Sequence, residues 1–270
     1  MSVTTDVAFL ETADGTLVAV HAPDVECFPF SLLVEREVRA LGLAVGDRVT
    51  VGSDALEIGG ERIVTTAVRP EPRAHSISPM SVAAVAALLD ECGPYVPCEP
   101  VVRGSEQFLA SLVHADGNRV DRAILDLVGL GPGLTPSGDD LLLGFLALEH
   151  RVGSTWTGHG PGELADRIRA LSPGRTTRVS RALFDAAARD RFCPSVERLC
   201  RAVLQGDPVE GRAATQALLE IGAHSGRDTL AGMRAYCELA RRRESRSLRR
   251  RRDRPSERTA RHRTRGSERG

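Results

Sequence analysis

The sequence predicts an α+β protein, with a small β-rich N-terminal domain followed by an α-helical C-terminal domain that carries two pseudo-equivalent loop-helix motifs. Three observations support this fold class. Short apolar runs alternate with turns in the first 70 residues, apolar residues recur with a helical period after residue 79, and one phrase at a helix start occurs twice. We expect a β-rich domain over 1–75, a helical domain over 76–240 and a disordered arginine-rich tail over 241–270.

The N-terminal domain is predicted from short strands joined by tight turns. Ala13-Asp14-Gly15 separates the first two strands and Gly59-Gly60 separates the last two, and both turns are typical of hairpins. We expect these strands to form a small sandwich or barrel, followed by a linker that contains prolines. The expected strands are 7–10, 17–20, 47–51, 55–58 and 62–65.

The C-terminal domain is predicted from helical periodicity and from residues that favour helix ends. Asp207-Pro208 combines a capping side chain with a first-turn proline, and Gly222 suits the end of the same helix. Residues 118–128 carry apolar side chains three and four positions apart, which is a helical spacing. The expected helices are 79–93, 118–128, 162–171, 176–190, 195–205, 209–221 and 226–242, and one more that starts at Ser137 and contains the apolar run 141–148.

The composition excludes several kinds of chemistry. All 36 basic residues are arginine, so there is no lysine for a Schiff base or for a phosphate-binding P-loop. The net charge of zero conceals a balance of −10 over residues 1–240 and of +10 over residues 241–270. The tail has too few apolar residues to form a core, and it either binds nucleic acid or another acidic surface or is a poorly constrained extension.

The cysteines and the hydropathy pattern indicate a cytoplasmic protein with reduced thiols. The six cysteines form no C-x-x-C pair and no zinc-ligand spacing, so we expect them to be small buried hydrophobic residues. The N-terminus lacks the pattern of a secretory signal, and no apolar run reaches the roughly 18 residues that a membrane span needs. We therefore expect no association with a membrane.

The most informative feature is a phrase that occurs twice, at 129–140 and at 222–228. With an offset of 88 residues both copies read S-G-x-D-x-L-x-G-x-x-A. Positions 0, 3, 7 and 10 of a helix lie on one face, which begins polar and continues with small residues in both copies. We expect the two helices to pack along these Gly/Ala faces, with their N-termini close together as two halves of one site. The matched pairs are Ser137/Ser225, Gly138/Gly226, Asp140/Asp228, Leu142/Leu230, Gly144/Gly232 and Ala147/Ala235.

Each copy also has the spacing of a helix cap. With Ser137 as the N-cap, Asp140 is the third helical residue, and the two form an arrangement like a capping box that Ser225 and Asp228 repeat. A plain cap is the structural interpretation of either copy taken alone. Two helix N-termini aimed at one place also form an anion site, because both offer free amide donors and partial positive charge.

The composition of the first loop favours a ligand over a cap alone. Its glycines let backbone amides approach a ligand closely, and its two prolines stiffen it. It lacks the G-K-[ST] ending of a Walker A loop and the βαβ context of a Rossmann fingerprint. His224 is either a general base or a hydrogen-bonded structural residue.

The acidic residues complicate the prediction of an anion site. Asp140 and Asp228 repel a phosphate unless they cap, pair with arginine or share a divalent cation such as Mg²⁺, so the need for a metal stays open. The catalytic candidates are Asp140, Asp228, Ser137 and Ser225. The candidates for substrate or anion binding are Gly131, Gly133, Thr135, Gly138, Asp139, Arg175, Thr176, Thr177, Arg178, Ser180, His224, Gly226 and Arg227.

Three motifs together resemble the AllH family, which is described as a subunit of oxamate carbamoyltransferase. They are the loop 129–140, the run Thr176-Thr177-x-x-Ser180 and the segment 221–232. The resemblance covers roughly residues 125–240. It implies the conversion of oxalurate and phosphate to oxamate and carbamoyl phosphate in allantoin catabolism, beside other carbamoyltransferase subunits. The chain departs from the family pattern at Ala223-His224, where the family has His-Thr or Asn-Thr before Ser-Gly.

The sequence therefore supports three hypotheses of function. The first is a carbamoyltransferase subunit that binds a small anionic substrate and stabilises the reaction electrostatically. The second is a non-catalytic assembly or regulatory subunit that binds a partner or a nucleotide. The third, a nucleic-acid-associated protein that uses the arginine tail, ranks last because the acidic body offers no second basic patch.

Overall fold

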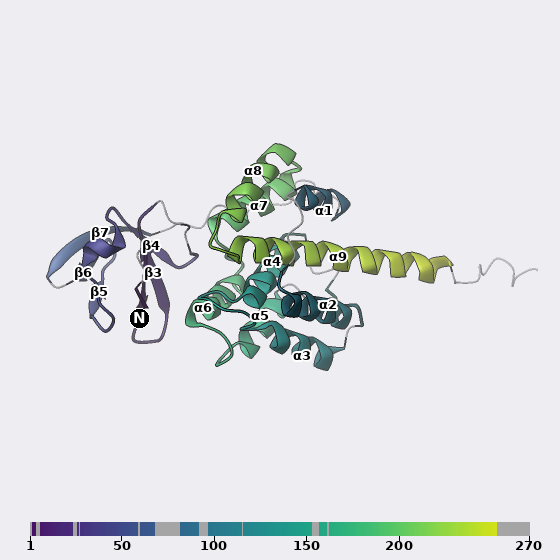
Figure 1. The fold of residues 1–270 in the computed structure, drawn as a ribbon, viewed down its shortest axis with the longest axis horizontal. Coiled ribbons are helices and arrows are strands. Elements are labelled where there is room, and N and C mark those ends of the chain that lie inside the picture. Colours follow the sequence, from purple (N-terminus) through teal and green to yellow (C-terminus); the bar gives the residue numbers. More distant parts are fainter. Residues whose placement is uncertain are drawn as a thin grey trace, which may run out of the picture.

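The chain folds into a β sheet followed by a helical domain, which confirms the α+β class (Figure 1). The computed structural model describes residues 2–3, 6–23, 26, 28–58, 60–67, 82–91, 97–114, 116–152, 157–160 and 162–252. The expected boundary between the two domains at residues 75 and 76 lies outside these residues.

The described strands pair in the order β1-β2-β3-β4-β7-β6-β5. β7 pairs with β4 through residues 65–67 and with β6 through residues 61–64, so it joins two parts of the sheet. Both expected hairpins are present, β2 with β3 and β6 with β7, and Gly15 and Gly60 adopt positive φ in their turns. β3 and β4 pair in parallel, and β4 was not expected from the sequence. The strands are β1 Ser2–Val3, β2 Val7–Glu11, β3 Leu17–His21, β4 Ser31–Val34, β5 Val49–Val51, β6 Ala55–Ile58 and β7 Glu61–Ala67, with a 3₁₀ helix at Val38–Leu41.

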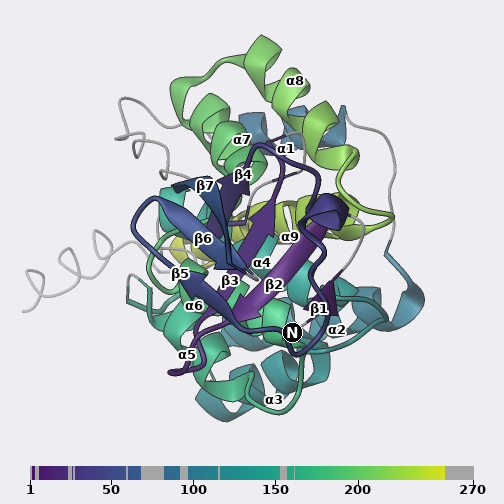
Figure 2. The same ribbon diagram turned by 90° about the vertical axis from the view of Figure 1, so that its left-hand side faces the viewer.

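Both faces of the sheet are apolar, so residues along its strands do not alternate regularly between apolar and polar. Phe9 and Ala19 point towards the helices and join the main core. Ala8 and Leu10 point the other way and pack with Leu56 of β6 in a second, smaller core. Figure 2 shows the sheet in front of the helical domain, which it covers on one side.

The helical domain holds every helix that the sequence predicts and one more. The additional helix is α2, and α9 runs ten residues further than expected. None of the described helices combines the length and apolar character needed to cross a bilayer. The helices are α1 Val82–Asp90, α2 Glu99–His114, α3 Gly117–Leu127, α4 Ser137–Val152, α5 Glu163–Leu171, α6 Arg178–Ala187, α7 Pro194–Gln205, α8 Pro208–Leu219 and α9 Ser225–Arg252.

The repeat seen in the sequence extends over three helices in each half, α2-α3-α4 and α7-α8-α9. Asp116 caps α3 and Asp207 caps α8, each accepting hydrogen bonds from two backbone amides of the first turn. The halves exchange contacts, because α2 packs against α9 and α7 packs against α4. The helical domain is therefore built from two equivalent units around the α4–α9 pair.

Glycine brings α4 and α9 into backbone contact, as the sequence predicts. A Cβ on Gly144 would overlap the carbonyl oxygen of Thr229, and a Cβ on Gly232 would overlap that of Leu141. The contact is reciprocal, since each helix supplies one glycine and receives the other. The expected tight packing along the Gly/Ala faces is thus confirmed.

A second pair of equivalent glycines fixes where each helix starts. Gly138 lies against the carbonyl oxygen of Leu127 at the end of α3, and Gly226 lies against that of Leu218 near the end of α8. No side chain fits at either position. The start of each central helix is therefore pinned to the end of the helix before it.

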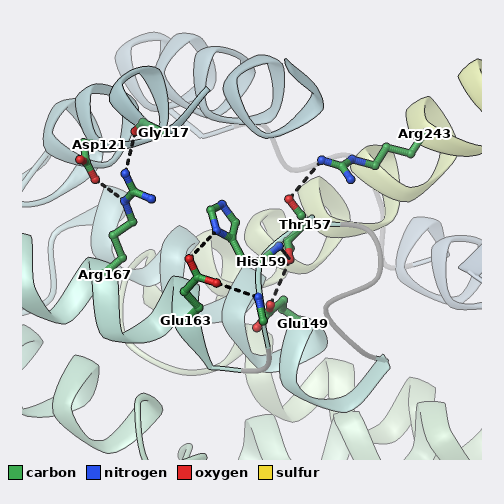
Figure 3. A network of polar contacts seen from close by, with 9 residues as sticks. Gly117, Asp121, Glu149, Thr157, His159, Glu163, Arg167 and Arg243 are labelled. Carbon is green, nitrogen blue, oxygen red and sulfur yellow. Dashed lines mark hydrogen bonds and ion pairs between the residues drawn. The ribbon is translucent and has the colours of Figure 1, made fainter. Parts of the chain in front are cut away.

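The helix α9 includes residues 241–252, where we expected the beginning of a disordered tail. Arg243 donates hydrogen bonds to the carbonyl oxygens of Leu112 and Thr157, the latter at 3.1 Å (Figure 3). Arg246 donates to the carbonyl oxygen of Val113 at 3.2 Å. These arginines bind the exposed carbonyl groups at the end of α2, which gives the basic segment an anchor that composition alone does not reveal. Residues 253–270 lie outside the described part of the chain.

The expectation that the cysteines are buried is correct for two of the four in the described part of the chain and wrong for Cys98, which is exposed, while Cys193 is partly buried. Cys200 and Cys237 are each about 2% exposed, and burial raises the pKa of both thiols to about 12. Such thiols stay protonated and unreactive at neutral pH.

Replacing either central glycine by alanine should destabilise the fold. Gly144→Ala and Gly232→Ala place a methyl group against backbone, which cannot rotate away, so we expect each to lower the free energy of unfolding by roughly 1–3 kcal/mol or more. The measurement is urea denaturation followed by circular dichroism. Gly104→Ala is the matched control, because its methyl group meets only the flexible end of Leu127 and gains helix propensity. Equal stability of all three variants would contradict the close packing.

Arg243→Gln should loosen the C-terminal part of α9. The variant loses the guanidinium that bridges two carbonyl oxygens, so amide hydrogens of residues 241–252 should exchange faster with deuterium. Arg242→Gln is the control, since Arg242 pairs with Glu238 inside the same helix. Unchanged exchange in Arg243→Gln would show that the extension needs no anchor.

Candidate functional site

The starts of α4 and α9 meet, and three side chains join them. The hydroxyl oxygens of Thr135 and Ser225 lie 2.9 Å apart, in a hydrogen bond that crosses between the two halves of the repeat. Both hydroxyls also act on the carboxyl group of Asp140, where their hydrogen bonds favour the ionised form. The expected convergence of the two helix N-termini is therefore present.

The expected capping box at Ser137 and Asp140 is wrong. The amide of Asp140 donates to the carbonyl oxygen of Pro136 at 3.1 Å, so it is not available to the Ser137 hydroxyl. In the second copy the amide of Asp228 donates to the carbonyl oxygen of His224 at 2.9 Å. The carboxyl of Asp140 consequently reaches across to Ser225 instead of back along its own helix.

Burial dominates the electrostatics of Asp140, which is only 4% exposed. Burial raises the pKa of its carboxyl group from 3.8 to about 8, against the opposing hydrogen bonds from Ser225 and Thr135, and the nearby Asp228 and Asp139 add to the rise. Its Oδ2 atom is buried and has no hydrogen-bond partner. At pH 7 this carboxyl is therefore mostly protonated and holds a donor that the protein does not use.

The neighbouring Asp139 organises the loop instead of the pocket. Its Oδ1 accepts from the amide of Gly129 at 2.8 Å, and its Oδ2 accepts from the hydroxyl of Thr176. Burial raises the pKa of Asp139, and these hydrogen bonds lower it. Gly129 has φ of 78° and lies against the carbonyl oxygen of Arg175, so this position admits no side chain.

The start of α6 braces the other side of the loop. Thr177 caps α6 by accepting from the amide of Ser180 at 3.0 Å, and its hydroxyl donates to the carbonyl oxygen of Leu134. Ser180 is buried beside Asp139 and lowers the pKa of that carboxyl. These residues therefore surround the loop rather than a bound anion.

A pocket with a cavity volume of about 630 Å³ opens over Asp140. Its polar floor consists of Thr135, Asp140 and Ser225, and Gly226 lines it as well. The walls come from the sheet, from α6, from the start of α7 and from the end of α8. They include the apolar residues Val7, Phe28, Leu143, Val179, Leu183, Phe192 and Val196 and the charged residues Asp6, Glu26, Arg191 and Glu220.

Several of the predicted anion ligands lie away from this pocket. Arg178 forms an ion pair with Glu11 of the sheet, and the side chain of Arg175 is exposed. The described lining does not include Ser137, Gly131, Gly133, Gly138, Thr176, Thr177, Ser180, His224, Arg227 or Asp228. Asp228 is buried next to Asp140 and acts on it through its charge.

The side chains do not gather into an evident metal site. Among the described residues, no group of three or more His, Cys, Asp or Glu side chains is placed to hold an ion. The question of Mg²⁺ therefore stays as open as the sequence leaves it.

Residues 127–237 match the family described as oxamate carbamoyltransferase subunit AllH. This AllH region begins at the end of α3 and contains the loop, both helix starts and the 176–180 segment, so it confirms the resemblance. The sheet and the basic end of α9 lie outside it. No solved structure gave a significant match to the chain.

The AllH region supplies the floor of the pocket, but part of the wall comes from outside it. Glu26 and Phe28 precede β4, and Glu26 accepts from both the amide and the hydroxyl of Ser195 at the start of α7, at 3.2 and 2.7 Å. Sequence reasoning did not identify these residues or Arg191. No local motif marks them, because their role depends on contacts more than 150 residues apart in the chain.

The contribution of Asp140 to the stability of the protein should fall as the pH rises from about 4 to 8. Over this range the folded state keeps a proton on Asp140 that the unfolded state, with a carboxyl pKa near 3.8, has released. Asp140→Asn mimics the protonated acid, so the variant should lose this part of the slope and be more stable than the wild type at pH 8. Thermal melts across the range provide the measurement.

Glu149→Gln provides a comparison, because burial raises the pKa of Glu149 to about 7 at a place outside the pocket. This variant should lose only the part of the slope between about 4.5 and 7. Parallel pH profiles for wild type and Asp140→Asn would show that Asp140 ionises normally.

Proposed function

We propose that the chain is a subunit of an oxamate carbamoyltransferase and that the pocket over Asp140 binds the carbamoyl-bearing substrate. The AllH match supports the first part. The single observation that carries the second part is the buried, unpartnered Oδ2 of Asp140 at the meeting point of two helix N-termini. A donor held there has no partner in the described protein, which leaves it to a ligand or a bound water.

The polar floor suits a ureido or amide group. Such a group presents a carbonyl oxygen that accepts and N–H groups that donate. The Thr135 and Ser225 hydroxyls donate to the carbonyl oxygen. The protonated Asp140 holds its proton for the nitrogen that leaves, and the proton that the attacking hydrogen phosphate loses restores the acid. The partial positive charge at the starts of α4 and α9 stabilises negative charge that develops on that oxygen.

In the proposed reaction a phosphate oxygen attacks the carbamoyl carbon of oxalurate. The bond from that carbon to the internal nitrogen breaks, the nitrogen takes up a proton, and oxamate and carbamoyl phosphate form. Asp140 is the proton donor in this scheme, and Arg191 is the lining arginine available to the substrate carboxylate. Arginines 175, 178 and 227, which the sequence suggested for this role, are not among the lining residues.

The alternative is a non-catalytic subunit that binds a partner or a nucleotide. Three acids, Asp6, Glu26 and Glu220, line the pocket beside a single arginine. This balance disfavours a nucleotide with several phosphate charges more strongly than oxalurate, which carries a single carboxylate. The partners in either case are other carbamoyltransferase subunits.

The proposal is tested by carbamoyl phosphate formation from oxalurate and phosphate in a complex reconstituted with the partner subunits. Asp140→Asn and Ser225→Ala should each lower kcat/KM by about 10²-fold or more, since a positioned proton donor contributes on this scale. Asp126→Asn, which alters an exposed carboxylate on α3, is the control. Size-exclusion chromatography establishes that each variant assembles. If assembled Asp140→Asn complexes keep full activity, the catalytic role of the pocket is wrong and the non-catalytic assembly role replaces it.

A further inference from the structure

We propose that a second groove, between the β2–β3 turn and α6, binds a small oxyanion of the phosphate or carboxylate class. Its cavity volume is about 840 Å³, and polar surface dominates its lining. The sheet side contributes Glu11, residues 14–17, Pro29 and Phe30, and α6 forms the opposite wall. Four arginines line it, namely Arg178, Arg181, Arg189 and Arg191.

The acids of the groove are largely occupied. Glu11 is paired with Arg178. Asp14 is held by the hydroxyl of Thr12 and the amide of Thr16, and the Thr12 hydrogen bond in particular lowers the pKa of Asp14. Asp185 is the third acid, so four guanidinium groups face three carboxylates and the groove keeps a positive balance.

Two of the arginines are available to a ligand. Within the described part of the chain, the side chains of Arg181 and Arg191 make no hydrogen bond and no ion pair. Arg189 donates to the carbonyl oxygen of Asp185 at 3.1 Å. Guanidinium groups bind carboxylate and phosphate oxygens through paired N–H donors, so this set suits an oxyanion.

The turn that carries Arg189 and Arg191 is held rigidly from the inside. Between them Asp190 has φ of 57°, the single positive φ among the described non-glycine residues. Its carboxylate pairs with Arg151, whose side chain is 7% exposed and also binds Glu197 at 2.7 Å. A backbone held in a rare conformation by a buried ion-pair network keeps the flanking arginines in place before a ligand arrives.

Arg191 connects this groove to the pocket over Asp140, because it lines both. The other groove arginines do not line the pocket. The groove is therefore a separate site whose occupant lies next to the entrance of the first one. This inference does not depend on carbamoyl transfer.

The test is calorimetric titration of the full chain with inorganic phosphate and, separately, with malonate, in a buffer free of other oxyanions. At least one probe should bind saturably, and the pair of titrations distinguishes phosphate from carboxylate. Arg181→Gln should raise the Kd for that probe at least tenfold, and Arg181→Gln/Arg191→Gln should abolish the binding. Arg122→Gln, an exposed arginine on α3, is the control and should bind as the wild type does.

Asp140→Asn separates this inference from the proposed function. It should leave the binding in the groove unchanged, because Asp140 does not line it. Binding that is lost in Asp140→Asn but kept in Arg181→Gln would place the anion in the pocket and overturn the groove, because Arg181 lines the groove and not the pocket. The groove is equally overturned if neither probe binds or if the double variant binds as tightly as the wild type.

Discussion

The backbone contact between α4 and α9 is the constraint on which the rest of the structure depends. Gly144 and Gly232 let the two helices approach until the backbone of each touches the other. Because the contact is made by backbone on both sides, it leaves little freedom to slide or rotate. The distance between the two helix starts, and with it the Thr135–Ser225 hydrogen bond, follows from this packing.

The two consecutive aspartates at the start of α4 illustrate how one helix turn separates two tasks. Successive helical residues point about 100° apart. Asp139 is turned towards the loop, where both of its oxygens are bound by the protein. Asp140 is turned towards the pocket, where one oxygen is left without a partner. Because the two side chains point in different directions, Asp139 stabilises the loop and Asp140 presents its carboxyl group to the pocket.

Local signals predicted most of the fold. Residues close together in the sequence predict the cap at Asp207, both hairpins and the small-residue faces of α4 and α9, and all of these are present. The helix α2 was missed although its apolar spacing is helical, because Pro100 and Gly104 interrupt the pattern with residues that usually end helices. β4 was also not predicted.

The site was predicted only in part, because local sequence patterns indicate where helices start but not which distant residues their side chains contact. The meeting of two equivalent helix starts followed from the repeat, but the partners of each side chain did not. Arg178 forms an ion pair with Glu11 of the sheet. Tertiary packing places Glu26 and Arg191 at the pocket. Contacts between residues so far apart leave no trace in the local pattern of a single sequence.

The length of α9 has a mechanical consequence. Its first turn contains Ser225 and Asp228, and its last turns form the basic segment that Figure 1 shows projecting from the body. At a rise of 1.5 Å per residue, its 28 residues make a rod about 40 Å long. A molecule that binds the projecting end therefore contacts the same helix that supplies Ser225 to the pocket. One continuous helix joins the basic end to the floor of the pocket, with no loop between them.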